Sequence, residues 1–432
     1  MTQEAIKAVD SKNMRIIGHN DLGKFGDCGE GMAMHLKGGR RTLFVAHLNA
    51  PGDFSAVDVT DPRKPTVIYS QELPNPKSRS NCLMIVGDTM AVARQVVNVG
   101  DEKAGVEFYD ISNPEAPKSI GFWDAHGPGS PGCHFVWFID GEYCYAATGT
   151  SDWDPWQPNM GWIYVCLDVK DPTKPKEVGR WHLPGTSISD GFRVKSHAEE
   201  VADALGLPVP PGPIRGGIQV GDVMTWNSQN RVHDIYVYPQ RPDRAYIAYL
   251  DSGAIILDIS DKAHPKMVSQ LDYHPPLPGY THTAMPLFSK GLLAITEEGS
   301  ENPTCADHPK TLRFADISFE QNPILVSAVT LPNMDELCGK ERFGAHNVYD
   351  NPPVAGSFQS EDVVVGTFFS LGVRVYDLKD PWRPELTAFC IPPAPNGHPA
   401  TQMNDLHIDE RGVIYATERA ANGLFIMEWD RE

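Results

Sequence analysis

Residues 56–65 read AVDVTDPRKP: apolar residues lead into an aspartate, and a second aspartate is followed by two prolines. Aspartate side chains accept hydrogen bonds from nearby backbone N–H groups and proline fixes φ, so the stretch predicts a strand that ends in a tight turn. The second proline leads into another strand, where its missing N–H suits an edge position. Similar units occur at residues 108–117 (FYDISNPEAP), 166–175 (CLDVKDPTKP), 256–265 (ILDISDKAHP), 315–323 (ADISFEQNP) and 375–384 (VYDLKDPWRP).

The spacing of these units indicates a repeated structure. Their aspartates, at positions 58, 110, 168, 258, 316 and 377, lie 52 to 61 residues apart except for one interval of 90. Each unit also has candidate strands upstream, such as residues 133–138 and 142–148. Four short strands in about 50 to 60 residues is the size of one β-propeller blade.

The two ends of the chain predict a seventh blade. Residues 406–409, 413–417 and 424–428 supply three strands without a fourth, and residues 14–19 resemble the closing strand of another unit. Joining the two termini in one blade removes an exposed sheet edge. We therefore expect residues 1–432 to form one all-β domain, a seven-bladed β-propeller whose ring is closed by the N-terminal strand joining the C-terminal blade.

The interval of 90 residues places an insertion at about residues 185–230, between blades three and four. Residues 196–205 predict a short helix in it, because Ser196 can cap the first turn. Long ordered loops act as lids, binding walls or subunit contacts. Connections between blades lie on the face where each first strand begins. The insertion therefore predicts either an active-site entrance or a homo-oligomer interface at that face.

The chain resembles bacterial propeller proteins built from LVIVD repeats. The resemblance covers nearly the whole chain and rests on the Asp-x-x-Asp-Pro-x-x-Pro units, together with YTHTAMPL at residues 280–287, RFGAHN at 342–347 and TQMND at 401–405. It implies the propeller fold. It implies little chemistry, because many members of the family have no assigned activity.

The net charge and the composition indicate which binding partners and which cellular location to expect. A net charge of −19 repels phosphate groups, so neither nucleic acid nor an anionic membrane is an expected partner. The sequence has no apolar run of signal-peptide or membrane-spanning length, and its eight cysteines are scattered without a C-x-x-C pair. These features favour a cytoplasmic protein with reduced thiols.

A set of histidines marks the expected channel. The first strand of each blade lines the channel, so the residues at its beginning should face the axis. The openings of the seven first strands supply His35, Asn81, His134, His233, His282, His346 and His407. Converging imidazoles on a rigid scaffold suit a divalent transition metal such as Mn, Fe, Zn or Cu. The expected ligands are His134, His233, His282 and His346, with His407 nearby.

Other side chains predict the chemistry beside this metal. Glu297 and Glu418 occupy matching positions in blades five and seven, where each could orient a ligand histidine or act as a general base. Arg94 has the matching place in blade two and could bind a substrate carboxylate. Substrate-binding residues are expected to include an aromatic pair in one loop and a polar residue of the histidine set: Trp153, Trp156 and Asn81.

Each of these residues also has a structural interpretation. The histidines could bond only water and backbone carbonyls, and the glutamates could form ordinary salt bridges. The pattern favours a metal-dependent enzyme, of lyase or hydrolase type, acting on a small, partly apolar or aromatic organic substrate at the channel mouth. Two alternatives stay open: an iron-dependent oxygenase with a multi-histidine centre, and a non-catalytic propeller scaffold that binds a protein partner.

Overall fold

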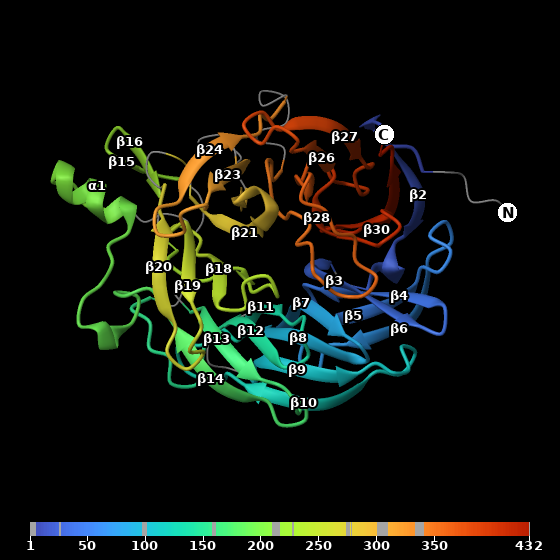
Figure 1. The fold of residues 1–432 in the computed structure, drawn as a ribbon, viewed down its shortest axis with the longest axis horizontal. Helices are drawn as coiled ribbons and strands as arrows, with labels where there is room; N and C mark the ends of the chain where they lie inside the picture. The colour runs from blue at the N-terminus through green and yellow to red at the C-terminus, as the bar shows by residue number, and fades with distance from the viewer. Residues whose placement is uncertain are drawn as a thin grey trace.

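The computed structural model describes residues 6–25, 27–96, 102–157, 161–209, 217–226, 229–273, 277, 279–299, 310–332 and 341–431. Seven four-stranded antiparallel sheets surround a central axis (Figure 1). Apolar side chains are buried between neighbouring sheets, and one such cluster extends from blade two to blade six. This arrangement confirms the predicted all-β, seven-bladed β-propeller. Within the described residues, no helix is long and apolar enough to span a membrane.

The first five blades each use four strands that follow one another along the chain. Blade one contains β3 (Cys28–Lys37), β4 (Arg40–His47), β5 (Gly52–Asp58) and β6 (Thr66–Glu72). Blade two contains β7 (Ser78–Val86), β8 (Thr89–Val96), β9 (Gly105–Asp110) and β10 (Lys118–Asp124). Blade three contains β11 (Cys133–Trp137), β12 (Tyr143–Thr148), β13 (Ile163–Asp168) and β14 (Lys176–Trp181).

Blades four and five repeat this order. Blade four contains β17 (Ile235–Tyr236), β18 (Arg244–Ala248), β19 (Ala254–Asp258) and β20 (Lys266–Leu271). Blade five contains β21 (Thr281–Leu287), β22 (Leu292–Glu297), β23 (Leu312–Asp316) and β24 (Ile324–Ala328). In the described connections lie the short 3-10 helices η1 (Leu22–Lys24), η3 (Ile188–Asp190) and η4 (Phe288–Lys290).

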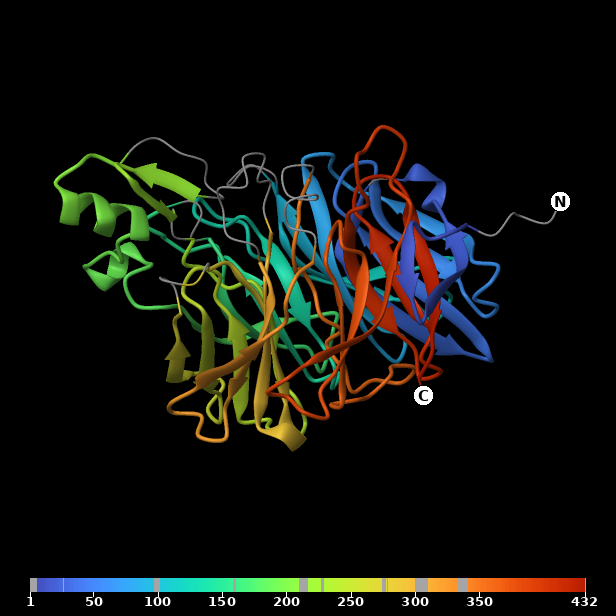
Figure 2. The same ribbon diagram turned by 90° about the horizontal axis from the view of Figure 1, so that it is seen from above.

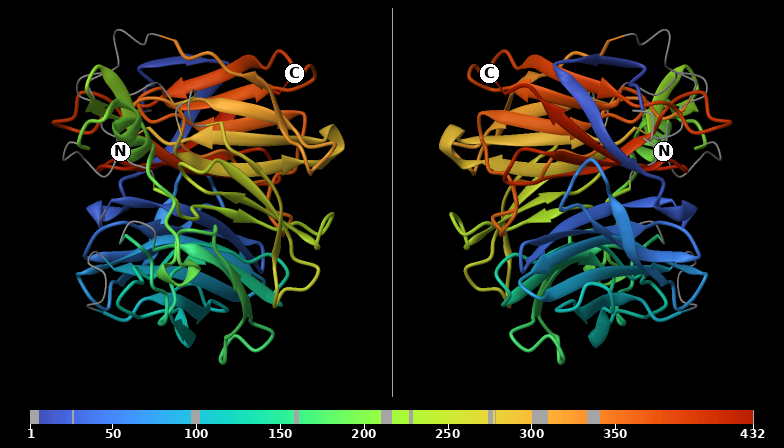
Figure 3. Two further views of the ribbon diagram at one scale, coloured as in Figure 1. Left: turned by 90° about the vertical axis from the view of Figure 1, so that its left-hand side faces the viewer. Right: turned by 90° about the vertical axis from the view of Figure 1, so that its right-hand side faces the viewer.

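The N-terminus closes the ring at two blades (Figure 3). In blade seven, β2 (Met14–Asn20) is the outermost strand and pairs with the last of β28 (Met403–Ile408), β29 (Ile414–Glu418) and β30 (Gly423–Trp429). This pairing confirms the predicted closing strand. The sequence did not predict β1 (Asp10–Lys12), which adds an outer strand to β27 of blade six.

Blade six has an irregular innermost segment. Its named strands are β25 (Val363–Thr367), β26 (Val373–Asp377) and β27 (Glu385–Ile391). Residues 346–349 run beside β25, where His346 N donates to Thr367 O at 3.0 Å and Tyr349 N donates to Val365 O at 2.8 Å. A long connection, residues 350–362, then leads to β25. This connection is longer than those between the first and second strands of the other blades.

The aspartate-proline turns form as predicted. Asp58 Oδ1 accepts a hydrogen bond from Thr60 N at 3.0 Å, and Asp61 Oδ1 accepts one from Arg63 N at 3.1 Å. Several of these turns also pack against the outer strand of the preceding blade. A Cβ atom built on Gly121 of β10 would lie 2.0 Å from Pro172 O in the turn of blade three. The repeat therefore ends a strand and also holds neighbouring blades together.

Replacing Gly121 by valine is expected to destabilise the protein. The added side chain would overlap the backbone of the next blade, and overpacking of this kind costs about 1–3 kcal/mol. Thermal unfolding of Gly121→Val should therefore begin at a lower temperature than that of the parent protein. Lys118→Val is the matched control, because Lys118 is exposed on the same strand. Equal unfolding of the two variants would contradict the packing role.

The insertion projects from the edge of the propeller (Figure 2). It contains α1 (His197–Leu205) and a hairpin of β15 (Gly217–Val220) and β16 (Val223–Trp226). Ser196 caps α1 through Glu199 N, which confirms the predicted helix and cap. Residues 210–216 and 227–228 of the predicted insertion lie outside the described residues. Self-association through this segment stays a prediction.

Candidate metal centre

The innermost strands of five blades begin with a β-bulge, and each bulge contains one residue of a set that has a member in every blade. In β11 the register passes from Cys133–Thr148 to Phe135–Ala147, which leaves His134 unpaired. Corresponding irregularities occur in β3, β7, β21 and β28. A bulge re-aims a side chain and is common beside active sites. One residue per blade defines what we call the channel ring: Glu30, Asn81, His134, His233, His282, His346 and Asn404.

This ring differs from the predicted set in two blades. Glu30 and Asn404 take the places predicted for His35 and His407. His35 Nε2 lies 2.9 Å from Asp88 Oδ1, and the His407 ring packs 5.9 Å from that of Tyr349. The prediction took His35 and His407 as the openings of their strands. The ring residues Glu30 and Asn404 lie at the bulges near the start of β3 and β28, whereas His35 and His407 lie beyond those bulges, paired with Thr42 and Tyr415.

Glycines on both sides of Glu30 bring β3 close to β7. A Cβ atom on Gly29 would lie 2.7 Å from Asn81 O, and one on Gly31 would lie 2.3 Å from Leu83 N. Any side chain at either position would push blades one and two apart. The Gly-Glu-Gly sequence at residues 29–31 therefore indicates that Glu30 lies where two blades meet closely, and the prediction did not use it.

The four histidines predicted as ligands lie together in consecutive blades. His134 Nε2 and His233 Nε2 are 2.9 Å apart. The ring centroids of His233 and His282 are 3.9 Å apart, and those of His282 and His346 are 4.3 Å apart. Within the described residues, two groups of ligand atoms are close enough to hold a metal ion: Glu30 with His233 and His282, and Glu298 with His282 and His346.

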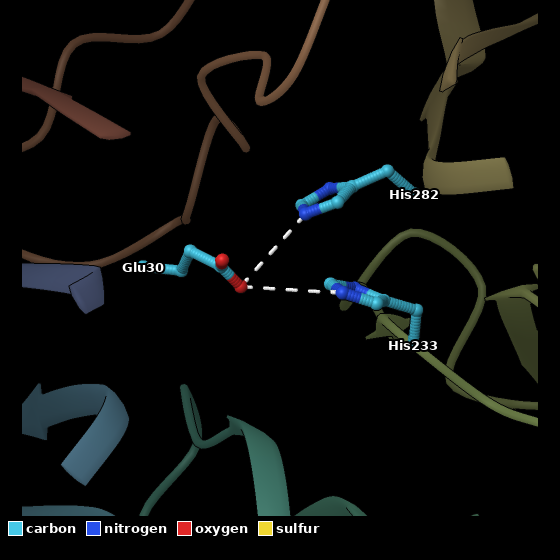
Figure 4. Close-up of side chains that lie close together, drawn as sticks. All are labelled: Glu30, His233 and His282. Carbon is cyan, nitrogen blue, oxygen red and sulfur yellow. Dashed lines mark ion pairs between the residues drawn. The ribbon is translucent and has the colours of Figure 1, made fainter. Parts of the chain in front are cut away.

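Glu30 reaches all four histidines from the opposite side. Its Oε2 lies 3.5 Å from His134 Nε2, 4.0 Å from His233 Nε2 and 3.8 Å from His282 Nε2. Its Oε1 lies 3.6 Å from His346 Nε2. Figure 4 shows the carboxylate pointing toward His233 and His282. Asn81 Nδ2 donates to Glu30 Oε2 at 2.9 Å, so Asn81 holds the carboxylate in place.

Hydrogen bonds at the Nδ1 atoms fix the tautomers of three of these histidines. His233 Nδ1 donates to Asp234 Oδ1 at 2.8 Å, and His346 Nδ1 donates to Asn404 O at 2.6 Å. His134 Nδ1 donates to Gln95 Oε1 at 3.0 Å. A neutral imidazole that donates from Nδ1 keeps a lone pair on Nε2. The Nε2 lone pairs of these three residues therefore point toward Glu30.

Burial keeps the imidazoles of His134 and His346 neutral. Burial and the neighbouring His282 lower the pKa of His346 to about 4. Burial and the neighbouring His233 hold the pKa of His134 well below its ordinary value. Burial alone would raise the pKa of Glu30, but contacts with the histidines outweigh it and lower that pKa well below its ordinary value. The ring thus combines the neutral imidazoles of His134 and His346 with the ionised carboxylate of Glu30.

This combination favours a bound cation. Lone pairs that face one another across 2.9 Å, as in His134 and His233, repel unless a proton or a metal ion lies between them. Two nitrogens bound to one tetrahedral metal lie about 3.3 Å apart, which is close to this separation. Among the described residues, the buried Nε2 atoms of His282 and His346 have no hydrogen-bond partner. The residues present therefore fit a divalent transition metal.

Two aromatic rings cover the ends of the histidine row. The Trp162 ring stacks on that of His134, with centroids 4.0 Å apart and planes 18° apart. The Phe369 ring lies 4.5 Å from that of His346. Arg231 lies 3.9 Å above the Trp162 centroid. The aromatic prediction had named Trp153 and Trp156 instead. Trp153 packs against His182 at 5.0 Å, and Trp156 Nε1 donates to Phe192 O at 2.9 Å.

The predicted carboxylates have structural partners. Glu297 is fully buried and lies 3.2 Å from Arg313 Nε, and burial raises its pKa to about 7. Glu418 accepts four backbone N–H bonds, from Gln402, Ala420, Ala421 and Asn422. The glutamate of blade five that lies beside the ring is instead Glu298, whose Oε1 is 4.0 Å from His346 Nε2.

Arg94 is also held inside the protein. Its guanidinium pairs with Asp53 and with Glu107 Oε2 at 2.7 Å, and it donates to Tyr109 Oη at 2.6 Å. These bonds join the second and third strands of blade two to blade one. These bonds occupy the N–H donors of Arg94 that would be needed to bind a substrate carboxylate.

Comparison with known proteins agrees with the fold. A family model described as the LVIVD repeat matches residues 243–272, which span the outer three strands of blade four. The comparison with curated proteins gave no match. Among solved structures, the chain is similar to the Cps50 (Swd1) beta-propeller domain of Myceliophteria thermophila, with a TM-score of 0.54 and 12% identity, covering 96% of this chain and 100% of that one. At this identity the similarity shows the fold alone. The chain is thus a seven-bladed β-propeller that carries an LVIVD repeat.

Proposed function

We propose that this protein is a metal-dependent enzyme, of lyase or hydrolase type, that acts on a small, partly apolar or aromatic organic substrate. The observation that carries the proposal is the convergence of four histidine Nε2 atoms on the Glu30 carboxylate, at 3.5 to 4.0 Å. The proposed ligands are Glu30, His134, His233, His282 and His346. His407 is left out because it packs against Tyr349.

The four imidazoles and one carboxylate restrict which metal ions the site could bind. Imidazole suits Fe, Cu, Ni and Zn, and the added carboxylate also suits Mn. Five donors exceed the four of a closed structural zinc site, so the set favours a metal that accepts five or six ligands. A bound metal would supply a Lewis acid that polarises a substrate oxygen.

The surrounding residues support such a reaction. Asp234 and Asn404 O fix the tautomers of His233 and His346, as partners behind metal ligands commonly do. Trp162 and Phe369 are buried and cover His134 and His346, so apolar rings enclose both ends of the histidine row. Glu298, beside His346, is placed to accept a proton from a bound molecule.

A second candidate is an iron-dependent oxygenase. Four histidine imidazoles together with a carboxylate are suitable ligands for iron. The identity of the bound metal separates the two candidates, since iron favours the oxygenase and zinc excludes it.

Metal analysis of the full-length protein tests the proposal. We expect close to one transition-metal ion per chain after purification without added metal. Chelation should lower the midpoint of thermal unfolding, because a ligand that binds only the folded state stabilises it by about 4 kcal/mol at a thousand times its Kd. Negligible metal together with an unchanged midpoint would contradict the proposal and favour the scaffold alternative.

A further inference from the structure

The channel ring and the adjoining Glu298 supply two triads of the same composition. Each triad has two histidines from neighbouring blades and one glutamate. The first triad is Glu30, His134 and His233, whose facing Oε2 and Nε2 atoms are 2.9 to 4.0 Å apart. Two histidines and one carboxylate are a common ligand set for a divalent metal, and they leave other coordination positions open.

The second triad is His282, Glu298 and His346, whose ligand atoms all lie within 4.8 Å of one another. All three side chains are buried, and Glu298 Oε1 is 4.0 Å from His346 Nε2. Among the described residues, the Nε2 atoms of both histidines are without a hydrogen-bond partner. Buried polar atoms without a partner are costly, and a cation at this triad would supply the partner.

Glu30 connects the two triads. Its Oε2 lies 3.5 Å from His134 Nε2 in the first triad, and its Oε1 lies 3.6 Å from His346 Nε2 in the second. A carboxylate whose two oxygens face different ligands is placed to bridge two metal ions, which lie about 3.5–4 Å apart in two-metal sites. His282 Nε2 is also 3.8 Å from Glu30 Oε2, but one imidazole nitrogen binds only one ion.

The charged residues behind the triads fit this arrangement. Arg342 Nη1 donates to Glu298 Oε1. A carboxylate oxygen has two lone pairs, so Oε1 can accept this bond and still bind a metal, as ligating carboxylates commonly do. The buried Asp234 carboxylate lies 2.8 Å from His233 Nδ1 and 3.7 Å from His282 Nδ1. One negative charge thus lies behind both triads and offsets part of the repulsion between two cations.

We propose that this site binds two divalent transition-metal ions when metal is supplied, one at each triad, with the Glu30 carboxylate between them. The inference rests on the proposed function, because it divides the donors of the same site. The second ion takes His282 and His346 from the first and takes Glu298 as a ligand.

The second ion binds more weakly than the first. Arg342 lies on Glu298, and Arg419 Nη1 lies 3.4 Å from Glu30 Oε1, the oxygen that faces His346. Both guanidinium groups repel a cation at the second triad. Purification without added metal therefore leaves one ion, and the second ion is found only at saturation.

Equilibrium dialysis of the full-length protein against Co²⁺, combined with EPR spectroscopy, tests the inference. The protein is first freed of metal by chelation, and excess Mg²⁺ occupies weak oxygen-only sites on its acidic surface. We expect two Co²⁺ ions per chain at saturation. The EPR signal should rise as the first ion binds and fall as the second binds, because ions about 3.5–4 Å apart couple magnetically.

A matched pair of variants locates the second ion. Glu298→Gln should saturate at one Co²⁺ per chain and keep the full EPR signal of an isolated ion, because the second triad loses its carboxylate. Glu297→Gln is the control: Glu297 is the neighbouring buried glutamate, pairs with Arg313 and belongs to neither triad. This control should bind two ions, with the loss of signal seen in the parent.

The outcomes separate this inference from the metal proposal, and the parent protein alone decides between one ion and two. Saturation of the parent at one Co²⁺ overturns the second site and leaves the proposed function intact. Absence of bound Co²⁺ contradicts the proposed function itself. Two ions without magnetic coupling, or two ions in Glu298→Gln, show that the second ion does not bind at this triad.

Discussion

Alanine at His233 is expected to abolish metal retention. His233 lies in the middle of the ring, with Nε2 2.9 Å from His134 Nε2 and 4.0 Å from Glu30 Oε2. Residues that only support metal ligands change metal affinity by about 10- to 100-fold, so removal of a ligand should cost at least about 100-fold. Elemental analysis of His233→Ala after dialysis should find less than about a tenth of the parent metal content.

His407→Ala provides a matched control for this loss. His407 is also a buried histidine of an innermost strand, and burial lowers its pKa to about 4. It packs against Tyr349 and Tyr415 and belongs to neither group of candidate ligands. We expect His407→Ala to be less stable but to keep its metal. Metal loss in this variant, or full occupancy in His233→Ala, would show that the proposed ligand set is wrong.

The repeat predicted most of the fold because its signals are local. An aspartate that bonds the backbone two residues later and a proline that fixes φ need no distant partner, as Asp58 and Thr60 illustrate. The cap of α1 by Ser196 is equally local. The closing strand β2 was predictable because blade seven lacked a fourth strand. By contrast, β1 has three exposed residues without an apolar pattern, so nothing in its sequence indicated pairing with blade six.

The site was less predictable because it depends on register. Histidines in four consecutive blades share one place in the repeat, and counting from the aspartates located them. Glu30 and Asn404 occupy bulges, where the two-residue alternation of a strand fails. Glu298 was missed for a related reason: neighbouring residues of a strand face opposite sides, and the match with Glu418 pointed to Glu297.

Removing residues 1–21 should prevent stable folding. This deletion takes away β2, whose residues pair with β30 from Met14–Trp429 to Asn20–Leu424. It also removes Met14 from the buried cluster of blades six and seven, and it leaves β30 as an unpaired edge. Each lost backbone hydrogen bond costs about 1 kcal/mol, so the total is comparable with a protein stability of about 5–15 kcal/mol. We expect the deleted protein to be mostly insoluble, as measured by soluble yield.

A shorter deletion separates ring closure from the general effect of truncation. Removing residues 1–12 takes away β1 but leaves β2 in place. Blade six then still has β25, β26 and β27 together with its innermost segment, residues 346–349. This shorter variant should remain soluble and unfold cooperatively, with a midpoint lower than that of the parent by only a few degrees. Equal soluble yields for the two deletions would mean that β2 is not needed to close the propeller. The channel ring, which joins Asn404 of blade seven to Glu30 of blade one through Arg419, would then have to be held by contacts near the axis alone.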